Sequence, residues 1–422
     1  WKVRDVDLTG FDMYGSDDPE PEFVDVNEND VAVVSLQENN HVALVDLRTR
    51  KVIGDFTAGA VDLTDIDAIE DDLIIFANDL DDVVREPDAI AWVGDHIATA
   101  NEGDLFGGSR GFSIFEQDGE LVYDAGNTFD TLARDIGHYP ESRSENKGSE
   151  PESIAYAEFS DGGYLFVGSE RGSFVGVYSG AETGTPVLHQ VLPTGLGPEG
   201  LLPIPERDLL VVSSEEDDPT FGVRATITIY EYGAASPSYP EVRSGGTLVT
   251  DGVGWSALSG MAASADGSTA YAVWDSYFAE SKVFEIDLAT TPATVIDHHT
   301  LTDGTDPVGY DLEGVALDGE NGFWAVSEGA VSGGLNTTEN LLLRVNSDFE
   351  VTREISLPDE VVACRQAMID QVPVVDGEPD RDSPEYARAR NLRFGFEGVT
   401  VDDEGNVLVA QQRGWEFDEL DV

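Results

Sequence analysis

The chain has 422 residues, and its 84 acidic and 23 basic side chains give a formal net charge of −61. A surface this negative repels phosphate backbones, so the composition excludes a nucleic-acid partner. The 41% apolar residues suffice for a sizeable core, but no apolar run reaches the roughly 18 residues that a membrane span needs. The single cysteine, Cys364, excludes an intrachain disulfide and a cysteine zinc cluster.

The excess of carboxylates predicts a halophilic protein. In about 1 M salt the Debye length falls to about 3 Å, so repulsion between the carboxylates is screened. The aromatic residues and the strand patterns indicate that the chain folds despite its charge.

One unit recurs seven times along the chain. It consists of two short strands joined by a turn, and most copies have an acidic residue at the start of the first strand and another after the second. In the clearest copy, strands at 314–317 and 323–327 flank a turn whose Gly and Asn residues tolerate positive φ. The copies cover 22–38, 88–102, 152–170, 199–215, 259–275, 313–328 and 397–412.

A unit of two strands cannot bury its own apolar faces, so the copies must stack against one another. Two further strands are predicted after most hairpins, for example at 42–47 and 52–56 and at 341–345 and 351–357. Four strands per unit, arranged radially, predict an all-β fold, a β-propeller of about seven four-stranded blades. A two-sheet sandwich is the alternative, but it predicts no repeat of this length.

The repeats run almost end to end, which predicts a single domain over 1–422 with insertions at 60–84, 131–149 and 373–393. Residues 1–8 alternate between apolar and polar and predict the outer strand of a blade. The last repeat stops before its outer strands. The terminal blades are therefore predicted to be incomplete, and the way in which the ring closes stays open.

The insertion at 60–84 is dense in carboxylates, and Asp62, Asp65 and Asp67 are predicted to bind Ca²⁺ through the oxygen ligands that this ion prefers. Chance clustering is the alternative in a chain this acidic. The insertion at 373–393 is predicted to be an irregular loop across one face or a lid over a site.

The few cations gather at particular places. Several lie in the insertion at 131–149, one lies in a glycine-rich loop, and others follow hairpins. Either they pair with the carboxylates of the repeats or they bind an anionic ligand. The predicted substrate-binding residues are Arg110, Arg134, Arg143, Lys147, Arg171 and Arg413.

The first strand of a propeller blade starts at the central channel, so acidic residues from separate blades are expected to converge there and to hold divalent cations. Asp88, Glu199 and Glu397 are predicted metal ligands, and Glu152, Glu313 and His138 are predicted catalytic residues. Alternatively, each acid caps its own strand by accepting backbone N–H bonds. The glutamates that end second strands, including Glu102 and Glu170, are expected on the opposite rim or as partners of arginines.

Several runs resemble a known family: VAVVSLQENNHVALVDL, GHYPESRSENKGSEPESI, LEGVALDGENGFWAVSEG and FGFEGVTV. They are similar to secreted bacterial and archaeal proteins described as esterase-like activity of phytase family proteins. The N-terminal half also resembles the choice-of-anchor I repeat region and its alkaline-phosphatase-like relatives. The resemblance implies an extracellular or cell-surface β-propeller that binds calcium and hydrolyses a small anionic phosphate ester. A non-catalytic binding module in a larger cell-surface assembly is the alternative.

Overall fold

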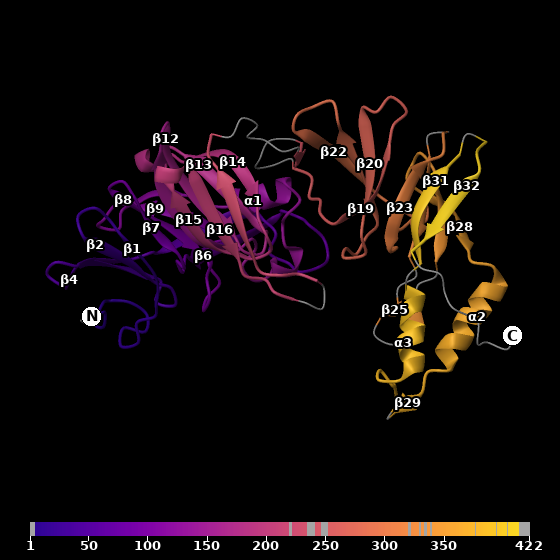
Figure 1. Cartoon of the computed structure of the whole chain (residues 1–422), viewed down its shortest axis with the longest axis horizontal. Helices are drawn as coiled ribbons and strands as arrows, with labels where there is room; N and C mark the ends of the chain where they lie inside the picture. Colours follow the sequence, from indigo (N-terminus) through magenta and orange to yellow (C-terminus); the bar gives the residue numbers. More distant parts are fainter. Residues whose placement is uncertain are drawn as a thin grey trace. The chain divides into compact units, whose positions relative to one another are not determined.

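The computed structural model describes residues 5–218, 222–233, 241–245, 252–319, 322–328, 331–332, 336–337, 340–375, 377–393, 395–402 and 404–412 (Figure 1). The chain divides into two compact units. Unit 1 comprises Trp1–Tyr239 with Thr247–Gly254, and unit 2 comprises Pro240–Gly246 with Trp255–Val422. Each unit is described by itself, and the single domain over 1–422 stays a prediction.

In unit 1, each of the first four predicted repeats forms an antiparallel sheet. Their strands pair in chain order, so that each sheet is a meander. The strands are β1 (Pro21–Val26), β2 (Val31–Leu36), β3 (His41–Asp46) and β4 (Lys51–Thr57); β7 (Ile90–Val93), β8 (His96–Asn101), β9 (Gly111–Phe115) and β10 (Leu121–Asp124); β11 (Pro151–Phe159), β12 (Gly162–Ser169), β13 (Phe174–Ser179) and β14 (Val187–Pro193); and β15 (Pro198–Ile204), β16 (Leu209–Ser214) and β17 (Thr226–Glu231).

Unit 2 contains the last three repeats. In the first of its sheets, β18 (Val242–Ser244) adds a parallel fifth strand beside β22. The strands are β19 (Leu258–Ala263), β20 (Thr269–Trp274), β21 (Lys282–Asp287) and β22 (Ala293–Thr300); β23 (Leu312–Leu317), β24 (Phe323–Ser327), β27 (Leu341–Val345) and β28 (Val351–Ser356); and β31 (Phe396–Val401) and β32 (Val407–Gln411). A small pair, β25 (Val331–Ser332) and β26 (Asn336–Thr337), follows β24.

The first strands of successive sheets lie side by side. In unit 1 the order is β1, β7, β11 and β15, and in unit 2 it is β19, β23 and β31. The other strands of each sheet follow outward from this first strand. This is the strand order of propeller blades. The predicted all-β class and all seven predicted hairpins are confirmed.

Apolar side chains fill the space between neighbouring sheets, as the stacking argument requires. Val33 and Leu44 of the first sheet meet Ile97 and Phe115 of the second. In unit 2, Val283 of one sheet and Leu343 of the next belong to one buried cluster. Burying these faces between sheets is the main force that holds each unit together.

The insertions contain more regular structure than the sequence indicated. The one at 60–84 is a two-stranded sheet of β5 (Ala60–Ile66) and β6 (Asn78–Val84). Near 131–149 lie α1 (Thr128–Asp135) and the 3-10 turn η1 (Glu141–Arg143). Two further turns, η2 (Ala181–Thr183) and η3 (Pro205–Arg207), lie in unit 1.

Describing 373–393 as irregular was wrong. It contains β29 (Val374–Val375), β30 (Glu378–Pro379), α3 (Pro384–Arg390) and η4 (Asn391–Arg393), and it follows α2 (Asp359–Asp370). The α3 helix begins where the hydroxyl of Ser383 accepts the amide of Tyr386, with Pro384 at the first position. Of the predicted N-terminal strand, residues 5–8 form none, and residues 1–4 lie outside the described residues.

Candidate functional site

Each hairpin brings the acid at its start close to the acid at its end. The amide of Glu170 donates to the carbonyl of Glu150 at 2.9 Å, and the amide of Glu328 donates to that of Asp311 at 2.8 Å. Both acids of a hairpin therefore lie on the same rim of the sheet, because the first strand of an antiparallel hairpin starts beside the end of the second. The expectation of an opposite rim for the second acid was wrong.

Glycines let the first strands of unit 2 approach closely. A Cβ on Gly260 would lie 2.6 Å from the Cα of Gly314, and a Cβ on Gly314 would lie 3.0 Å from the carbonyl oxygen of Glu397. Neither contact leaves room for a side chain. The residues before these glycines, Ser259 and Glu313, are drawn together as a result.

Three carboxylates converge on this rim of unit 2. Asp275 follows β20, Asp311 precedes β23 and Glu313 lies in β23, and one oxygen of each lies within 4.8 Å of the others. The hydroxyl of Ser259 donates to Oε2 of Glu313 at 2.5 Å, which orients that carboxylate. The amide of Ser276 donates to Oδ1 of Asp275 at 2.5 Å.

Burial and neighbouring charges raise the pKa of two members of this cluster, Asp311 and Glu313. Burial first, and then the charges of Asp275 and Glu397, raise the pKa of Glu313 to about 7. Burial and the charge of Asp275 also raise the pKa of Asp311. In the described part of unit 2, no lysine or arginine forms an ion pair with any of these four carboxylates. The charge of the cluster is therefore not offset by a described cationic side chain, and neutral donors such as the hydroxyl of Ser259 stabilise the carboxylates.

Unit 1 has a corresponding cluster, which is fully buried. Oxygens of Glu102, Glu150 and Glu170 lie within 4.8 Å of one another. Here three cations neutralise the carboxylates. Lys147 binds Glu102, Arg143 Nε lies 2.5 Å from Glu150 Oε1, and Arg171 lies 3.1 Å from Glu150 and 2.9 Å from Glu170.

Three predicted acids lie beside this cluster. Burial and the charges of Glu102, Glu22 and Glu199 raise the pKa of Asp88 to about 8. Burial, Glu170 and Glu199 raise the pKa of Glu152 to about 10. The structure thus brings Asp88, Glu152 and Glu199 together from three repeats, as expected for the starts of first strands.

The predicted substrate cations of unit 1 already bind groups of the protein. Arg143, Lys147 and Arg171 pair with glutamates, which is the simpler of the two predicted roles. Arg110 is 1% exposed, donates to the carbonyls of Asp67 and Ser144, and faces Asp130 at 3.5 Å. A guanidinium buried in this way is not available to a substrate.

Two more of the predicted residues have structural contacts. Arg134 is buried, pairs with Asp135 at 2.8 Å and lies over the ring of Phe76. His138 Nδ1 lies 2.6 Å from the carbonyl of Gly172. Arg413 lies outside the described residues.

The predicted calcium residues of the first insertion do not converge. Asp62 accepts the amide of Asp82 at 2.9 Å, and Asp67 accepts the amide of Ile75 at 2.9 Å. Burial raises the pKa of Asp67 to about 6. Among the described residues, the groups of three acids that could share an ion do not include Asp62, Asp65 or Asp67. The carboxylates of Asp62 and Asp67 thus stabilise their own hairpin.

Of the six members of the two clusters, sequence reasoning predicted only Glu313 as a site residue. It expected Glu102 and Glu170 on the opposite rim or as partners of arginines, and it did not single out Glu150, Asp275 or Asp311 as ligands. The signal for Glu150 and Asp311 was an acid two positions before a predicted one, just outside the first strand of its hairpin.

Sheets of four antiparallel strands stacked through their first strands, with acids on one rim, define an all-β repeat protein of the propeller class. Residues 253–421 match the family described as Esterase-like activity of phytase, and residues 6–107 and 105–183 match the Choice-of-anchor I domain. Both resemblances seen in the sequence are confirmed. The cluster of Asp275, Asp311 and Glu313 lies in the region that matches the phytase family, and the cluster of Glu102, Glu150 and Glu170 lies in the region that matches the choice-of-anchor domain.

No curated protein matches the chain. Among solved structures it is similar to hydrazine synthase of Kuenenia stuttgartiensis, at 14% identity over 97% of this chain and 99% of that chain, with a TM-score of 0.34. It is also similar to virginiamycin B lyase from Staphylococcus aureus, at 10% identity over 95% and 94%, with a TM-score of 0.27. Likeness this low says nothing about what this chain does. Within the described residues, no helix has the length and apolar character needed to cross a membrane.

Proposed function

We propose that the chain is a calcium-dependent phosphomonoester hydrolase whose cation site is the cluster of Asp275, Asp311 and Glu313 in unit 2. The observation that carries the proposal is the convergence of three carboxylate oxygens within 4.8 Å, with which no lysine or arginine of the described residues forms an ion pair. The phytase-like match over 253–421 supports the reaction class.

The residues of this cluster fit a hard divalent cation. Carboxylate oxygens are the ligands that Ca²⁺ takes, and three of them supply enough charge to bind it. Burial first, and then the neighbouring carboxylates, raise the pKa of Glu313 to about 7, so a bound cation would stabilise its charged form. A bound cation would supply charge to offset a phosphate ester and to activate water. Asp275, Asp311 and Glu313 would hold it, and Ser259 would keep Glu313 in position.

The surroundings of the site are part of the proposal. The choice-of-anchor match over the N-terminal half supports an extracellular or cell-surface location. The net charge of −61 supports a halophilic protein that folds best in molar salt. The substrate would then meet the protein outside the cell, where calcium is plentiful.

A non-catalytic cell-surface module is the second candidate. The observation in its favour is the cluster of unit 1. There Lys147, Arg143 and Arg171 already neutralise the acids, so that no metal ion is needed. If unit 2 plays the same structural part through bound calcium alone, the chain would bind the ion without turnover.

The test is hydrolysis of p-nitrophenyl phosphate by the full chain in molar sodium chloride with calcium. We expect turnover that a chelator abolishes and that Asp311→Asn and Glu313→Gln lower by about 100-fold. Asp348→Asn, a change in an exposed turn of the same unit, is the matched control and should keep full activity. Calcium binding without turnover would favour the second candidate, and absence of both would end the proposal.

A further inference from the structure

A cavity of about 100 Å³ lies between the sheets β11–β14 and β15–β17 of unit 1. It adjoins the turn of the β11–β12 hairpin, at the other end of these strands from Glu152, so it is separate from both carboxylate clusters. Its lining includes the exposed His189, which shows that the cavity reaches the surface. Neither family match assigns it a role.

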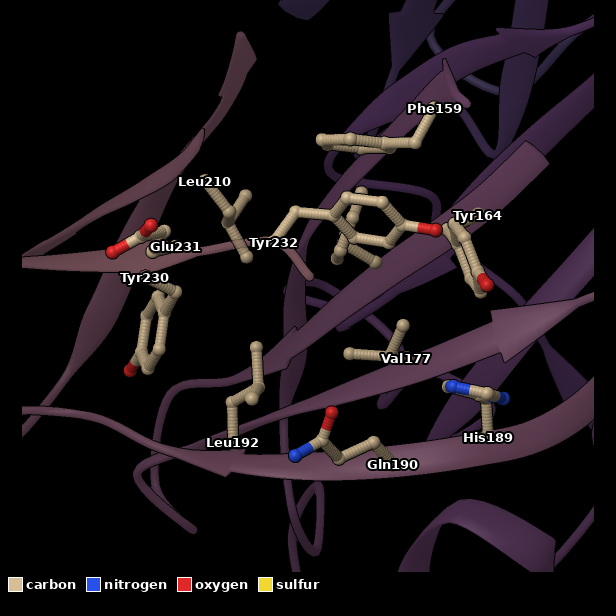
Figure 2. Close-up of a pocket in the computed structure, with 11 residues that line it drawn as sticks. Phe159, Tyr164, Val177, His189, Gln190, Leu192, Leu210, Tyr230, Glu231 and Tyr232 are labelled. Carbon is tan, nitrogen blue, oxygen red and sulfur yellow. The ribbon is translucent and has the colours of Figure 1, made fainter. Parts of the chain in front are cut away.

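The floor of the cavity is apolar. Phe166, Val177 and Leu210 line it and belong to the buried cluster between the two sheets. Figure 2 shows Val177 and Leu192 facing the space below the ring of Tyr232. Such a floor offers water no hydrogen bond, and an apolar cavity of about 150 Å³ is large enough to take up benzene. A cavity of this size, open at one end, therefore suits a guest with a single ring.

Aromatic rings stand around this floor. Phe159 packs on Tyr232 with ring centroids 4.7 Å apart, and the ring of Tyr164 lies 6.0 Å from that of Tyr232. Tyr230 lies two positions before Tyr232 and shares a face of the strand with it. Aromatic rings attract a further ring edge to face or in an offset stack. A flat aromatic guest therefore gains contacts that an aliphatic guest of the same size lacks.

Hydrogen bonds hold these rings in place. The hydroxyls of Tyr164 and Tyr232 donate to Asp161. The hydroxyl of Tyr230 donates to the carbonyl of Pro193. The walls are thus formed before a guest arrives, which lowers the entropy cost of binding.

No charged side chain selects an ion in this cavity. Glu231 borders the cavity, but it alternates with Tyr230 and Tyr232 along the strand, is exposed, and points away from the face that carries the two rings. None of the described residues that line the cavity is a lysine or arginine. An ion would lose its hydration here without gaining a partner, so a neutral guest is favoured.

One polar edge interrupts the apolar wall. The pairing of β13 with β14 skips His189, so that His189 and its neighbour Gln190 both reach the cavity. A bulge re-aims a side chain that a regular strand would point away. The ring of His189 lies 5.3 Å from that of Tyr164. A neutral imidazole has one donor and one acceptor nitrogen, so it can form a hydrogen bond with a hydroxyl group of the guest.

We propose that this cavity binds a small neutral phenol. The aromatic ring of the phenol lies among the rings of Tyr164, Tyr230 and Tyr232, and its hydroxyl forms a hydrogen bond with His189. The inference is independent of hydrolysis in unit 2.

The test compares probes that each differ from phenol in one property. Cyclohexanol keeps the hydroxyl and the size but lacks the aromatic ring, and benzoate and benzylammonium carry a charge. Each is titrated calorimetrically into the full chain at pH 7 and constant molar ionic strength. We expect phenol to bind about fivefold more tightly than cyclohexanol and at least about tenfold more tightly than either ion. No binding of phenol, equal binding of cyclohexanol, or an ion that binds as tightly as phenol would overturn the proposal.

Variants locate the site. Leu192→Trp fills the space and should abolish phenol binding, and Tyr232→Leu should weaken it by about fivefold. His189→Ala should weaken phenol binding by about threefold and leave the binding of toluene, which has no hydroxyl, unchanged. His96→Ala, at a histidine of β8 outside the cavity, is the matched control and should change neither. If the first two variants fail to fold, His189→Ala, an exposed change, still decides, because unchanged phenol affinity there contradicts the hydrogen bond.

Discussion

The two carboxylate clusters are built from the same parts of the repeat, yet only one of them is neutralised. In unit 1, Glu150 is inaccessible to solvent and is held by Arg143 and Arg171. In unit 2, Asp311 and Glu313 have hydroxyl and carboxylate neighbours but no cationic side chain among the described residues. The repeat thus places a cluster of acids at one rim. Whether cationic side chains pair with that cluster decides whether it is structural or, as we propose, open to an ion.

This difference between the clusters is informative because the chain has few basic side chains. Only 23 basic residues serve 84 acids, and three of them stand at one cluster. Placing cations there stabilises a buried charge group that would otherwise be strongly unfavourable. No described cation pairs with the cluster of unit 2, which is why we propose this cluster as the site of an external divalent ion.

The largest expected effect is on calcium affinity. Asp311→Asn should weaken calcium binding by about 100-fold or more, because a unit charge about 4 Å away at an effective dielectric constant of about 20 contributes about 4 kcal/mol. Calorimetric titration of the chelator-treated chain measures this. Glu170→Gln in unit 1 is the comparison and should leave the affinity unchanged. If Glu170→Gln instead removes the binding, the assignment of the two clusters is reversed.

For stability, in contrast to calcium affinity, we expect the larger effect from a change in the cluster of unit 1. Glu150→Gln should destabilise unit 1 by about 2–4 kcal/mol, because it takes a charged partner from Arg143 and Arg171 in a buried site. Without calcium, Glu313→Gln should not destabilise unit 2, since it removes repulsion. Hydrogen exchange with increasing urea reports on the two units separately. Equal losses in both variants would show that the two clusters are alike.

A backbone change should disturb unit 2 without touching a carboxylate. Gly314→Ala places a methyl group 3.0 Å from the carbonyl oxygen of Glu397, so the first strands must move apart at a cost of about 1–3 kcal/mol. We expect a lower thermal midpoint together with weaker calcium binding. Gly319→Ala, in the turn at the other end of the same hairpin, should leave calcium binding intact. Unchanged binding in Gly314→Ala would mean that strand spacing does not set the cluster.

The smallest effect is a pH dependence. The pKa of Glu313 is raised from its ordinary 4.5 to about 7, so the folded state holds this proton more tightly than the unfolded chain. The resulting stability is complete below about pH 4.5 and is lost as the pH rises to about 7. Urea unfolding of unit 2 with chelator should show this decline. Added calcium should remove it, and a decline that persists with calcium would argue against binding at Glu313.

Much of the fold could be predicted because its signals are local. The hairpin at 312–327 is defined by apolar strands and a glycine-containing turn, and the structure places both strands where the pattern did. The α3 helix was missed although Ser383 and Pro384 are a start signal, because the surrounding residues look irregular. The convergence of first-strand acids was predicted correctly within each unit.

Which of the two clusters has paired cations could not be predicted from the sequence. Lys147 reaches Glu102 across 45 positions of sequence, and Arg110 is turned inward by contacts with Asp67, Ser144 and Asp130 that are distant in sequence. An arginine in a glycine-rich loop has the same sequence pattern whether it faces solvent or the core. Only the tertiary structure shows which cations are already used.

The glycines where first strands touch tie the geometry of the acids to the main chain. Gly260 and Gly314 meet backbone to backbone, so the distance between repeats at this rim does not depend on the size of the side chains packed farther out. We therefore expect the apolar layers between the sheets to vary freely among descendants of this chain. Gain or loss of a whole repeat, in contrast, would alter which acids face one another and would create or erase an ion site in a single step.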